Sequence, residues 1–210
     1  MASFWKGLLK VSLWVGGVLL VIGGVLRIFF ITPISVGYDS MAPTFLAGEK
    51  VLLWRGGGIE MGDIVVCENP TRPGSMVFGR VMGKGGMTLG TGERGRFAIE
   101  GTRVDVDWQD TMRFFDSDAN IQVNVRRGVE TVGNTEHEIF VREATEFRLR
   151  ETVVPPGKLF LLGDNRGSRN HDSRSFGAVA EASCIGTVFM RWNPVDRGGE
   201  LSHGWLDFLD

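Results

Sequence analysis

Tyrosine, lysine and cysteine are all scarce in this 210-residue chain, and each scarcity excludes a class of protein. With one tyrosine, Tyr38, a tyrosine-rich recognition surface is not expected. Five lysines, a net charge of −2 and no charged tail give no basic excess, so no nucleic-acid partner is expected. The two cysteines have no metal-ligand spacing and cannot form a dense disulfide framework. We therefore predict neither a bound metal nor a cofactor.

Both cysteines lie in apolar runs of the sequence, which indicates that they are part of the core. Cys67 ends the apolar run Ile64–Cys67, and Cys184 begins another at Cys184-Ile185-Gly186. Free cysteine is among the most often buried residue types. The sequence therefore predicts two buried thiols rather than one bridge.

The first long feature that is present is an apolar segment. Residues 11–26 carry no charge, and residues 28–31 continue the run beyond Arg27. As a helix, residues 11–31 would span roughly 30 Å, enough to cross a bilayer with Arg27 reaching outward. No small-x-small cleavage site follows, and a soluble core helix is rarely apolar on every face. We predict an uncleaved transmembrane anchor at 11–31, preceded by a short N-terminus at 1–10. Basic residues flank both ends, so the charges leave its orientation open.

After Pro33 the pattern changes to short apolar runs separated by Gly- and Pro-rich turns. Such spacing is typical of an all-β, largely antiparallel domain. The expected strands are 50–54, 63–67, 76–82, 96–99, 121–125, 138–141, 158–162 and 185–191. Residues 84–149 are more polar and richer in Arg and Glu than their flanks, which indicates an inserted β cap. The organisation expected is a β core from 32–83 and 150–196, the cap at 84–149 and a C-terminal tail at 197–210.

Three motifs carry the chemistry. The first is Asp39-Ser40-Met41-Ala42-Pro43-Thr44, shortly after the apolar segment, and the second is Arg80-Val81-Met82-Gly83 on an apolar run. The third runs from Gly163-Asp164-Asn165-Arg166 to His171-Asp172-Ser173-Arg174. In this order and spacing they resemble type I signal peptidases, the membrane-anchored serine proteases that remove signal peptides from exported proteins. The resemblance covers residues 31–83 and 150–192 well and the insert only in outline.

The resemblance implies an all-β protease core, here called signal-peptidase-like, with its nucleophile near the membrane surface. It implies a cytoplasmic N-terminus and an extracytoplasmic catalytic domain on the plasma (inner) membrane, with signal peptides of preproteins and the lipid bilayer as partners. By analogy Ser40 is the nucleophile. The supporting and oxyanion residues implied are Tyr38, Arg80, Asp164, Ser168, Asp172 and Arg174.

The family's catalytic pair is a serine and a lysine, and the lysine has no counterpart in this chain. The family places a lysine immediately before the Arg-Val pair, and that position is Gly79 here. A serine hydroxyl needs a base within hydrogen-bond reach, and glycine has no side chain to supply one. Tyr38 and Asp39 also depart from the family, and Asp39 would bring a negative charge near a developing oxyanion. The third motif carries one extra residue between Arg166 and Asp172.

Another side chain would then have to act as the base. The side chains that follow the apolar segment and could do so are Lys50, Lys84, Lys158, His137, His171 and His203. His171 is the candidate, because its loop is the segment that the family packs beside the nucleophile; a solvated loop histidine is the other interpretation. Lys84 would need a sharp bend at Gly83 to reach the site.

Two functions of different classes remain. The first is a signal-peptidase-like serine endopeptidase that cleaves after small residues with an atypical base. The second is a catalytically inactive relative, a pseudoenzyme, that binds signal peptides or membrane partners. Function depends on the site rather than on the fold, so only the geometry around Ser40 bears on this choice.

Overall fold

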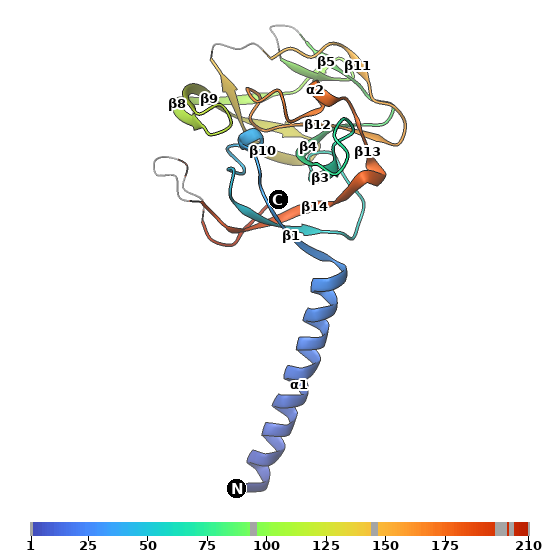
Figure 1. Cartoon of the computed structure of the whole chain (residues 1–210), viewed down its shortest axis with the longest axis vertical. Helices are drawn as coiled ribbons and strands as arrows, with labels where there is room; N and C mark the ends of the chain where they lie inside the picture. Colours follow the sequence, from blue (N-terminus) through green and yellow to red (C-terminus); the bar gives the residue numbers. More distant parts are fainter. Residues whose placement is uncertain (1, 93–95, 144–146, 196–200, 202–203, 210) are drawn as a thin grey trace.

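The computed structural model describes residues 2–92, 96–143, 147–195, 201 and 204–209. A long helix, α1 (Ala2–Phe29), extends away from a β domain (Figure 1). Its stretch Phe4–Phe29 has a mean hydropathy of 2.1 and no residue buried inside the protein, so it is long and apolar enough to cross a membrane. The helix begins at Ala2, well before the uncharged run, so the short N-terminus is part of the same helix.

The largest sheet has eight strands. Its spatial order is β1-β2-β14-β3-β4-β12-β13, and β15 pairs with β14. The pairings along this order are antiparallel. The strands are β1 (Ile31–Ser35), β2 (Lys50–Trp54), β3 (Ile64–Glu68), β4 (Met76–Lys84), β12 (Lys158–Leu162), β13 (Val179–Ala180), β14 (Cys184–Asn193) and β15 (Asp207–Phe208).

Two smaller sheets come mostly from the insert, and Figure 1 shows both farther from α1 than strands β1 and β14 of the large sheet. One has the order β10-β9-β8 and the other β11-β5-β6-β7. Their strands are β5 (Thr88–Thr91), β6 (Phe97–Ile99), β7 (Thr102–Arg103), β8 (Val106–Asp116), β9 (Ile121–Val132), β10 (Thr135–Arg142) and β11 (Thr152–Val153). The short helical turns are η1 (Asp39–Met41), α2 (Ser173–Phe176) and η3 (Glu181–Ser183).

The prediction of an all-β, largely antiparallel domain is confirmed. Each of the eight expected strands coincides with or overlaps an observed one, and 50–54 and 158–162 match β2 and β12 in full. The expectation missed β8, because its alternation of exposed and half-buried residues includes charged side chains and lacks a continuous apolar run. It also missed the short strands β1, β5, β7, β11, β13 and β15, the last of which is part of the expected tail and pairs with β14.

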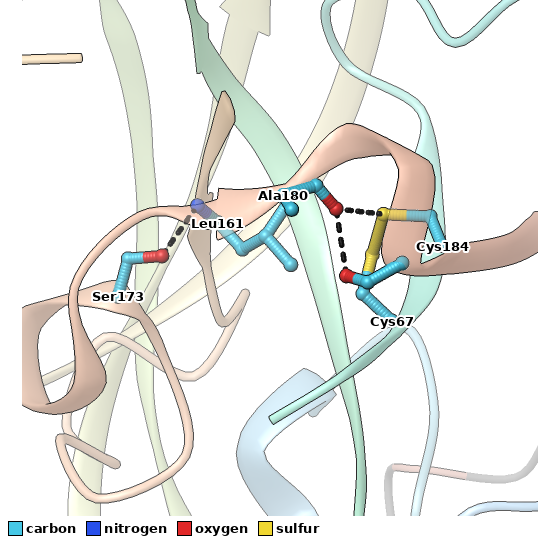
Figure 2. The surroundings of a disulfide bond; sticks show 6 residues. Cys67, Leu161, Ser173, Ala180 and Cys184 are labelled. Atoms are coloured by element: carbon cyan, nitrogen blue, oxygen red, sulfur yellow. Dashed lines mark hydrogen bonds between the residues drawn. A yellow bond between two sulfur atoms is a disulfide. The ribbon is translucent and has the colours of Figure 1, made fainter. Parts of the chain in front are cut away.

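The prediction of two free thiols is wrong. Cys67 and Cys184 form a disulfide (Figure 2). They are 117 residues apart in sequence, but they lie directly opposite each other on the adjacent strands β3 and β14. The sulfur of Cys184 lies 3.8 Å from the carbonyl oxygen of Ala180. Apolar runs around each cysteine indicate burial but carry no information about which strands become neighbours, so the sequence could not reveal the bridge.

Strand β4 is buried on both faces and separates two parts of the core. Phe78 packs on one face with Met41 and Phe45, which follow the turn of Ser40. Val77 and Val81 pack on the other face with Leu161 of β12. The alternation follows from the period of two along a strand. The turn that carries Ser40 therefore packs near the face of β4 that holds Phe78. Gly79 lies in the same strand, on the face that it shares with Val77 and Val81.

Candidate active site

Ser40, the predicted nucleophile, lies in the short turn η1, which is called the nucleophile turn below after that prediction. The residue is almost completely buried, with 3% of its surface exposed. The turn is held by the third motif: Asn165 donates its backbone N–H to the carbonyl oxygen of Ser40 at 3.0 Å. The Asn165 side chain donates to the carbonyl oxygen of Asp39 at 3.1 Å. Within the described part of the chain, the Ser40 hydroxyl makes no hydrogen bond of its own. The backbone of the turn is therefore fixed, and the hydroxyl is left without a hydrogen-bond partner among the described residues.

Gly163 allows this close approach between the nucleophile turn and the end of β12. A β-carbon at this position would lie 2.3 Å from the carbonyl oxygen of Ser40, which no side chain can tolerate. The glycine at the start of the third motif is therefore required by packing against Ser40.

Arg80 and Asp164 form a buried pair beside the nucleophile turn. The Arg80 guanidinium donates two hydrogen bonds to the Asp164 carboxylate, at 2.9 and 2.7 Å, and a third to the carbonyl oxygen of Gly62. Thr44 donates its hydroxyl to the same carboxylate at 2.5 Å. Burial alone would raise the pKa of Asp164, but the charge and hydrogen bonds of Arg80 hold it below its ordinary value. The pair therefore stays ionised and ties β4 to the third motif.

Asp172 and Arg174 form a second pair within the third motif. Asp172 caps α2 by accepting from the backbone N–H of Arg174, and it also accepts from Gly163 N–H at 3.3 Å. The Arg174 guanidinium binds this carboxylate and the carbonyl oxygens of Arg166 and Ser168. Ser168 contributes its backbone to this arrangement, so its side chain has no positioned role among the described contacts. The extra residue of this loop is accommodated without breaking either arginine pair.

Gly79 occupies the position of the family's lysine, on the face of β4 that it shares with Val77 and Val81. The face is apolar, as expected for a neutral amine. The space, however, is already filled: a β-carbon on Gly79 would lie 2.7 Å from the β-carbon of Leu161. No lysine would fit here without a shift of β12 relative to β4.

The other candidate bases differ in their surroundings. Lys84 donates to the carbonyl oxygen of Ile59 at 2.5 Å and lies near Glu60, so its amine is engaged away from the nucleophile turn. The Lys50 amine lies 5.6 Å from the centre of the Trp192 ring. Lys158 is exposed at the start of β12. His203 lies outside the described residues.

His171 lies against the nucleophile turn. Its ring stacks on the ring of Tyr38, with 3.8 Å between centroids and 22° between planes. Tyr38 is the residue two positions before Ser40 and precedes η1 directly, so the stack places an imidazole against the residue at the start of this turn. His171 is half-buried rather than a fully solvated loop residue.

Asp39 is turned toward the insert. Its fully buried carboxylate accepts from the backbone N–H of Ala47 at 2.8 Å and of Ser117 at 2.8 Å, and from the Ser117 hydroxyl. Its own N–H donates to the Asp118 carboxylate at 3.0 Å. The negative charge is therefore taken up by donors from the β8–β9 turn and from the segment after the nucleophile.

A second buried network was missed by the sequence analysis. Glu130 of β9 binds the guanidinium of Arg166 through both oxygens, and Nε2 of His137 lies 3.2 Å from it. Burial alone would raise the pKa of Glu130, but the charge of Arg166 lowers it to about 2. Nε2 of His137 also lies 3.9 Å from the Asp164 carboxylate. The network joins the insert to the third motif. In the sequence, only the polar composition of β9 hinted that the strand could take part in such a network.

A cavity of about 360 Å³ lies beside this network. Thr44, Arg80, His137 and Arg191 are among the residues that line it. Ser40 is not one of them. The cavity therefore adjoins the arginine–carboxylate framework rather than the hydroxyl.

The chain is similar in sequence to known proteins. The family model for signal peptidases, peptidase S26, matches residues 9–193. Signal peptidase IB of Staphylococcus aureus is 28% identical over 170 residues, which is 79% of this chain and 80% of that protein. Signal peptidase I of Pseudomonas aeruginosa is 25% identical over 197 residues, covering 80% of this chain and 66% of its own length. The crystal structure of a signal peptidase I from Enterococcus faecalis has 27% identity, covers 62% of this chain and 97% of its own, and gives a TM-score of 0.37.

An all-β domain with a buried serine turn, two arginine–carboxylate pairs and one long apolar helix is consistent with a membrane serine peptidase. Because the family model spans most of the sequence, the chain belongs to the signal peptidase family, whose members are serine-protease hydrolases that act on the signal peptides of preproteins.

Proposed function

We propose that this chain is a membrane-anchored endopeptidase that cleaves exported proteins after small residues, with Ser40 as nucleophile and His171 as general base. The observation that carries the proposal is the stack of His171 on Tyr38, two residues before a buried serine whose hydroxyl is unbonded within the described residues. No lysine is available at Gly79, and Lys84 is engaged with Ile59.

The chemistry follows from these groups. His171 would take the proton of the Ser40 hydroxyl as the serine oxygen bonds to the carbonyl carbon of the scissile peptide. The same proton then passes to the leaving amine as the C–N bond breaks. Water, deprotonated by the imidazole, then bonds to the acyl carbon. The imidazolium returns the proton to the serine oxygen as the C–O bond to Ser40 breaks, which releases the acid and regenerates the hydroxyl. Tyr38 is the side chain nearest in sequence that could donate to the oxyanion.

An open strand edge supports recognition of an extended peptide. β3 pairs with β4 from Met76 to Arg80, whereas β12 pairs with β4 from Arg80 onward, so residues 76–79 have one partner strand in the described structure. A peptide added at this edge would gain backbone hydrogen bonds. Phe78 and the partly buried Met76 and Ile34 pack in the adjoining core.

The membrane assignment rests on α1. Its apolar side chains are exposed along the whole stretch Phe4–Phe29, an arrangement that lipid would stabilise. We propose that it anchors the chain with its N-terminus in the cytoplasm and the β domain on the opposite face of the plasma (inner) membrane, where a translocated signal peptide is presented.

The test uses the full chain in membranes washed with alkaline carbonate and then dissolved in detergent, with a preprotein that has a small-x-small site. Cleavage should remain with the washed membranes, fall to background in Ser40→Ala and fall about 10²–10⁴-fold in His171→Ala. Ser75→Ala, a serine just before β4, serves as the matched control and should cleave at the wild-type rate.

Two results would contradict the proposal. A wild-type rate that survives both Ser40→Ala and His171→Ala would show that the active site lies elsewhere. A wild-type protein that is photocrosslinked to signal peptides at the Ser40 turn without cleaving them would be an inactive peptide-binding relative.

A further inference from the structure

We propose that the Cys67–Cys184 disulfide is a redox-sensitive clamp. It holds together two parts of the large sheet, and the proposed active site is divided between these parts. Opening the bridge with a dithiol lets the two parts move relative to each other and lowers the rate of cleavage. The inference rests on the proposed function for this effect on cleavage, while the clamp itself can be tested without activity.

The two parts are defined by the strand order of the large sheet. The first part is β1, β2, β14 and β15, and it includes the nucleophile turn, which lies in the chain between β1 and β2. The second part is β3, β4, β12 and β13, and it includes the third motif, which follows β12. Ser40 and Tyr38 therefore belong to the first part, and His171 belongs to the second. The stack of Tyr38 on His171 spans the boundary.

The two parts meet at a short seam between β3 and β14, whose residues are all described by the structure. The seam consists of three residue pairs with a register shift after the first: Cys67–Cys184, Val66–Gly186 and Val65–Thr187. The pairings on either side of it, β2–β14 and β3–β4, have five residue pairs each. The seam is therefore the shorter connection between neighbouring strands in this region, and the disulfide lies at one end of it.

A cavity lies at the other end of the seam. Ile64 and Val188, the next residues of β3 and β14, are not paired with each other and both line the cavity of about 360 Å³. Thr44 lines it from the first part and Arg80 from the second. Because the strands are separated there, the disulfide is the covalent cross-link that limits movement of one part of the sheet against the other.

Hydrogen bonds also cross the boundary at the nucleophile turn. Asn165 donates to the carbonyl oxygen of Ser40, and Thr44 donates to the carboxylate of Asp164. These bonds depend on the alignment of the two parts, because each joins a residue of the first part to a residue of the third motif. A seam that is free to open would therefore weaken the contacts that place Ser40 beside the third motif.

The bridge also contacts the strand that supports the loop of the proposed base. Cys67 and Cys184 pack in one apolar cluster with Leu161 of β12. The backbone N–H of Leu161 donates to the hydroxyl of Ser173 at 2.9 Å (Figure 2). Ser173 is the first residue of α2 and lies two positions after His171. The bridge and the loop of His171 are thus linked through Leu161.

The chemistry of opening is a thiol–disulfide exchange. Cys184 is half-buried between exposed neighbours, Ala182 and Ile185, whereas Cys67 is fully buried, so a reductant meets the sulfur of Cys184 first. A thiolate of the dithiol bonds to this sulfur, and the S–S bond breaks with its electron pair moving to Cys67, which takes up a proton. The second thiolate of the dithiol then bonds to the first, and Cys184 leaves and takes up a proton. The dithiol is oxidised to a disulfide, and the bridge is reduced to two thiols.

The experiment compares the oxidised full chain in detergent with the same protein reduced by dithiothreitol, with the thiols counted by alkylation and mass spectrometry. We expect kcat for preprotein cleavage to fall about tenfold to 10²-fold on reduction, because a misplacement of about 1 Å can cost about 10²-fold in rate. Reoxidation should restore the wild-type kcat.

Two variants separate the bridge from other effects of the reductant. The double variant Cys67→Ala/Cys184→Ala should cleave at the rate of the reduced protein and should not respond to dithiothreitol. Ser183→Ala, next to Cys184, keeps the bridge and is the matched control; it should cleave at the wild-type rate and respond to dithiothreitol as the wild type does.

Backbone hydrogen exchange tests the clamp without activity. Reduction should speed exchange in β3, in β14 and in the nucleophile turn. It should leave β9 and β10 of the insert unchanged, because these strands pair with each other over eight residue pairs and take no part in the seam.

Several results would overturn the inference. They are a bridge that dithiothreitol cannot reduce in the folded protein, a reduced protein with the wild-type kcat, and unchanged exchange at the seam. Faster exchange throughout the β domain, with β9 and β10 included, would make the bridge a general stabiliser and would overturn it as well. An inactive wild type would instead overturn the proposed function, and the exchange pattern would still decide whether the bridge clamps the seam.

Discussion

Leu161 occupies the space that a side chain on Gly79 would need: the two β-carbons would lie 2.7 Å apart. The contact joins β4 and β12 within the apolar cluster that also contains Val77 and Val81. The glycine at the family's lysine position is thus packed against the bulky side chain of Leu161, which fills the space of a longer side chain. A single substitution cannot restore the usual pair of groups, because the partner strand has closed over the position.

Gly79→Ala should therefore destabilise the protein. The added methyl group must push Leu161 and its strand away, and overpacking of this kind costs typically about 1–3 kcal/mol. The measurement is the free energy of unfolding from denaturant titration in detergent. Gly58→Ala is the control, because a β-carbon there meets nothing closer than 3.7 Å. Equal stability of the two variants would mean that β12 can move away from β4 at little cost in free energy. A lysine introduced by Gly79→Lys could then be accommodated and tested as a base.

Asp39→Gly, which removes the carboxylate next to Ser40, should lower cleavage rather than raise it. The Asp39 carboxylate accepts from Ala47 and Ser117, so its removal leaves buried donors without a partner and loosens the nucleophile turn from the insert. A loss of about 1–3 kcal/mol of stability is expected from the unpaired donors.

The readouts for Asp39→Gly are kcat and the free energy of unfolding. Ser117→Ala is the control, because it removes the hydroxyl donor but keeps the backbone N–H bond to Asp39. An increase in kcat in Asp39→Gly would show that the negative charge opposes the oxyanion after all.

The Glu130–Arg166 pair should make stability depend on acid pH. The folded-state pKa of Glu130 is about 2, below its ordinary value of 4.5, so the stabilisation is complete above about pH 4.5 and is lost as the pH falls toward 2. The corresponding free energy is about 3 kcal/mol.

Glu130→Gln should therefore be less stable than the wild type at neutral pH, with the gap closing as the pH falls through this window. The measurement is the free energy of unfolding at a series of pH values. Glu136→Gln, an exposed residue on β10, is the matched control. A gap of constant size from pH 7 to pH 2 would mean that the Glu130 carboxylate is not held ionised by Arg166.

Local patterns in the sequence determined the long apolar helix, most strands of the β domain and the positions of the three motifs. These features depend on residues close together in the chain, because apolar periodicity and turn residues act over a few positions. The absence of a lysine at Gly79 was likewise visible from the sequence, as was His171 as a candidate base. The pairs Arg80–Asp164 and Asp172–Arg174 were anticipated as a framework through the resemblance, although their geometry was not.

The tertiary structure alone decided which distant residues meet. Cys67 and Cys184 become partners because β3 and β14 are adjacent, and neither cysteine's surroundings in sequence distinguish a bridge from two thiols. Asp39 is separated by 79 residues from Asp118, so no local pattern could link the nucleophile turn to the insert. Leu161 faces Gly79 through the pairing of β12 with β4. Contacts of this kind depend on strand order and packing, which bring together side chains whose sequence positions are unrelated.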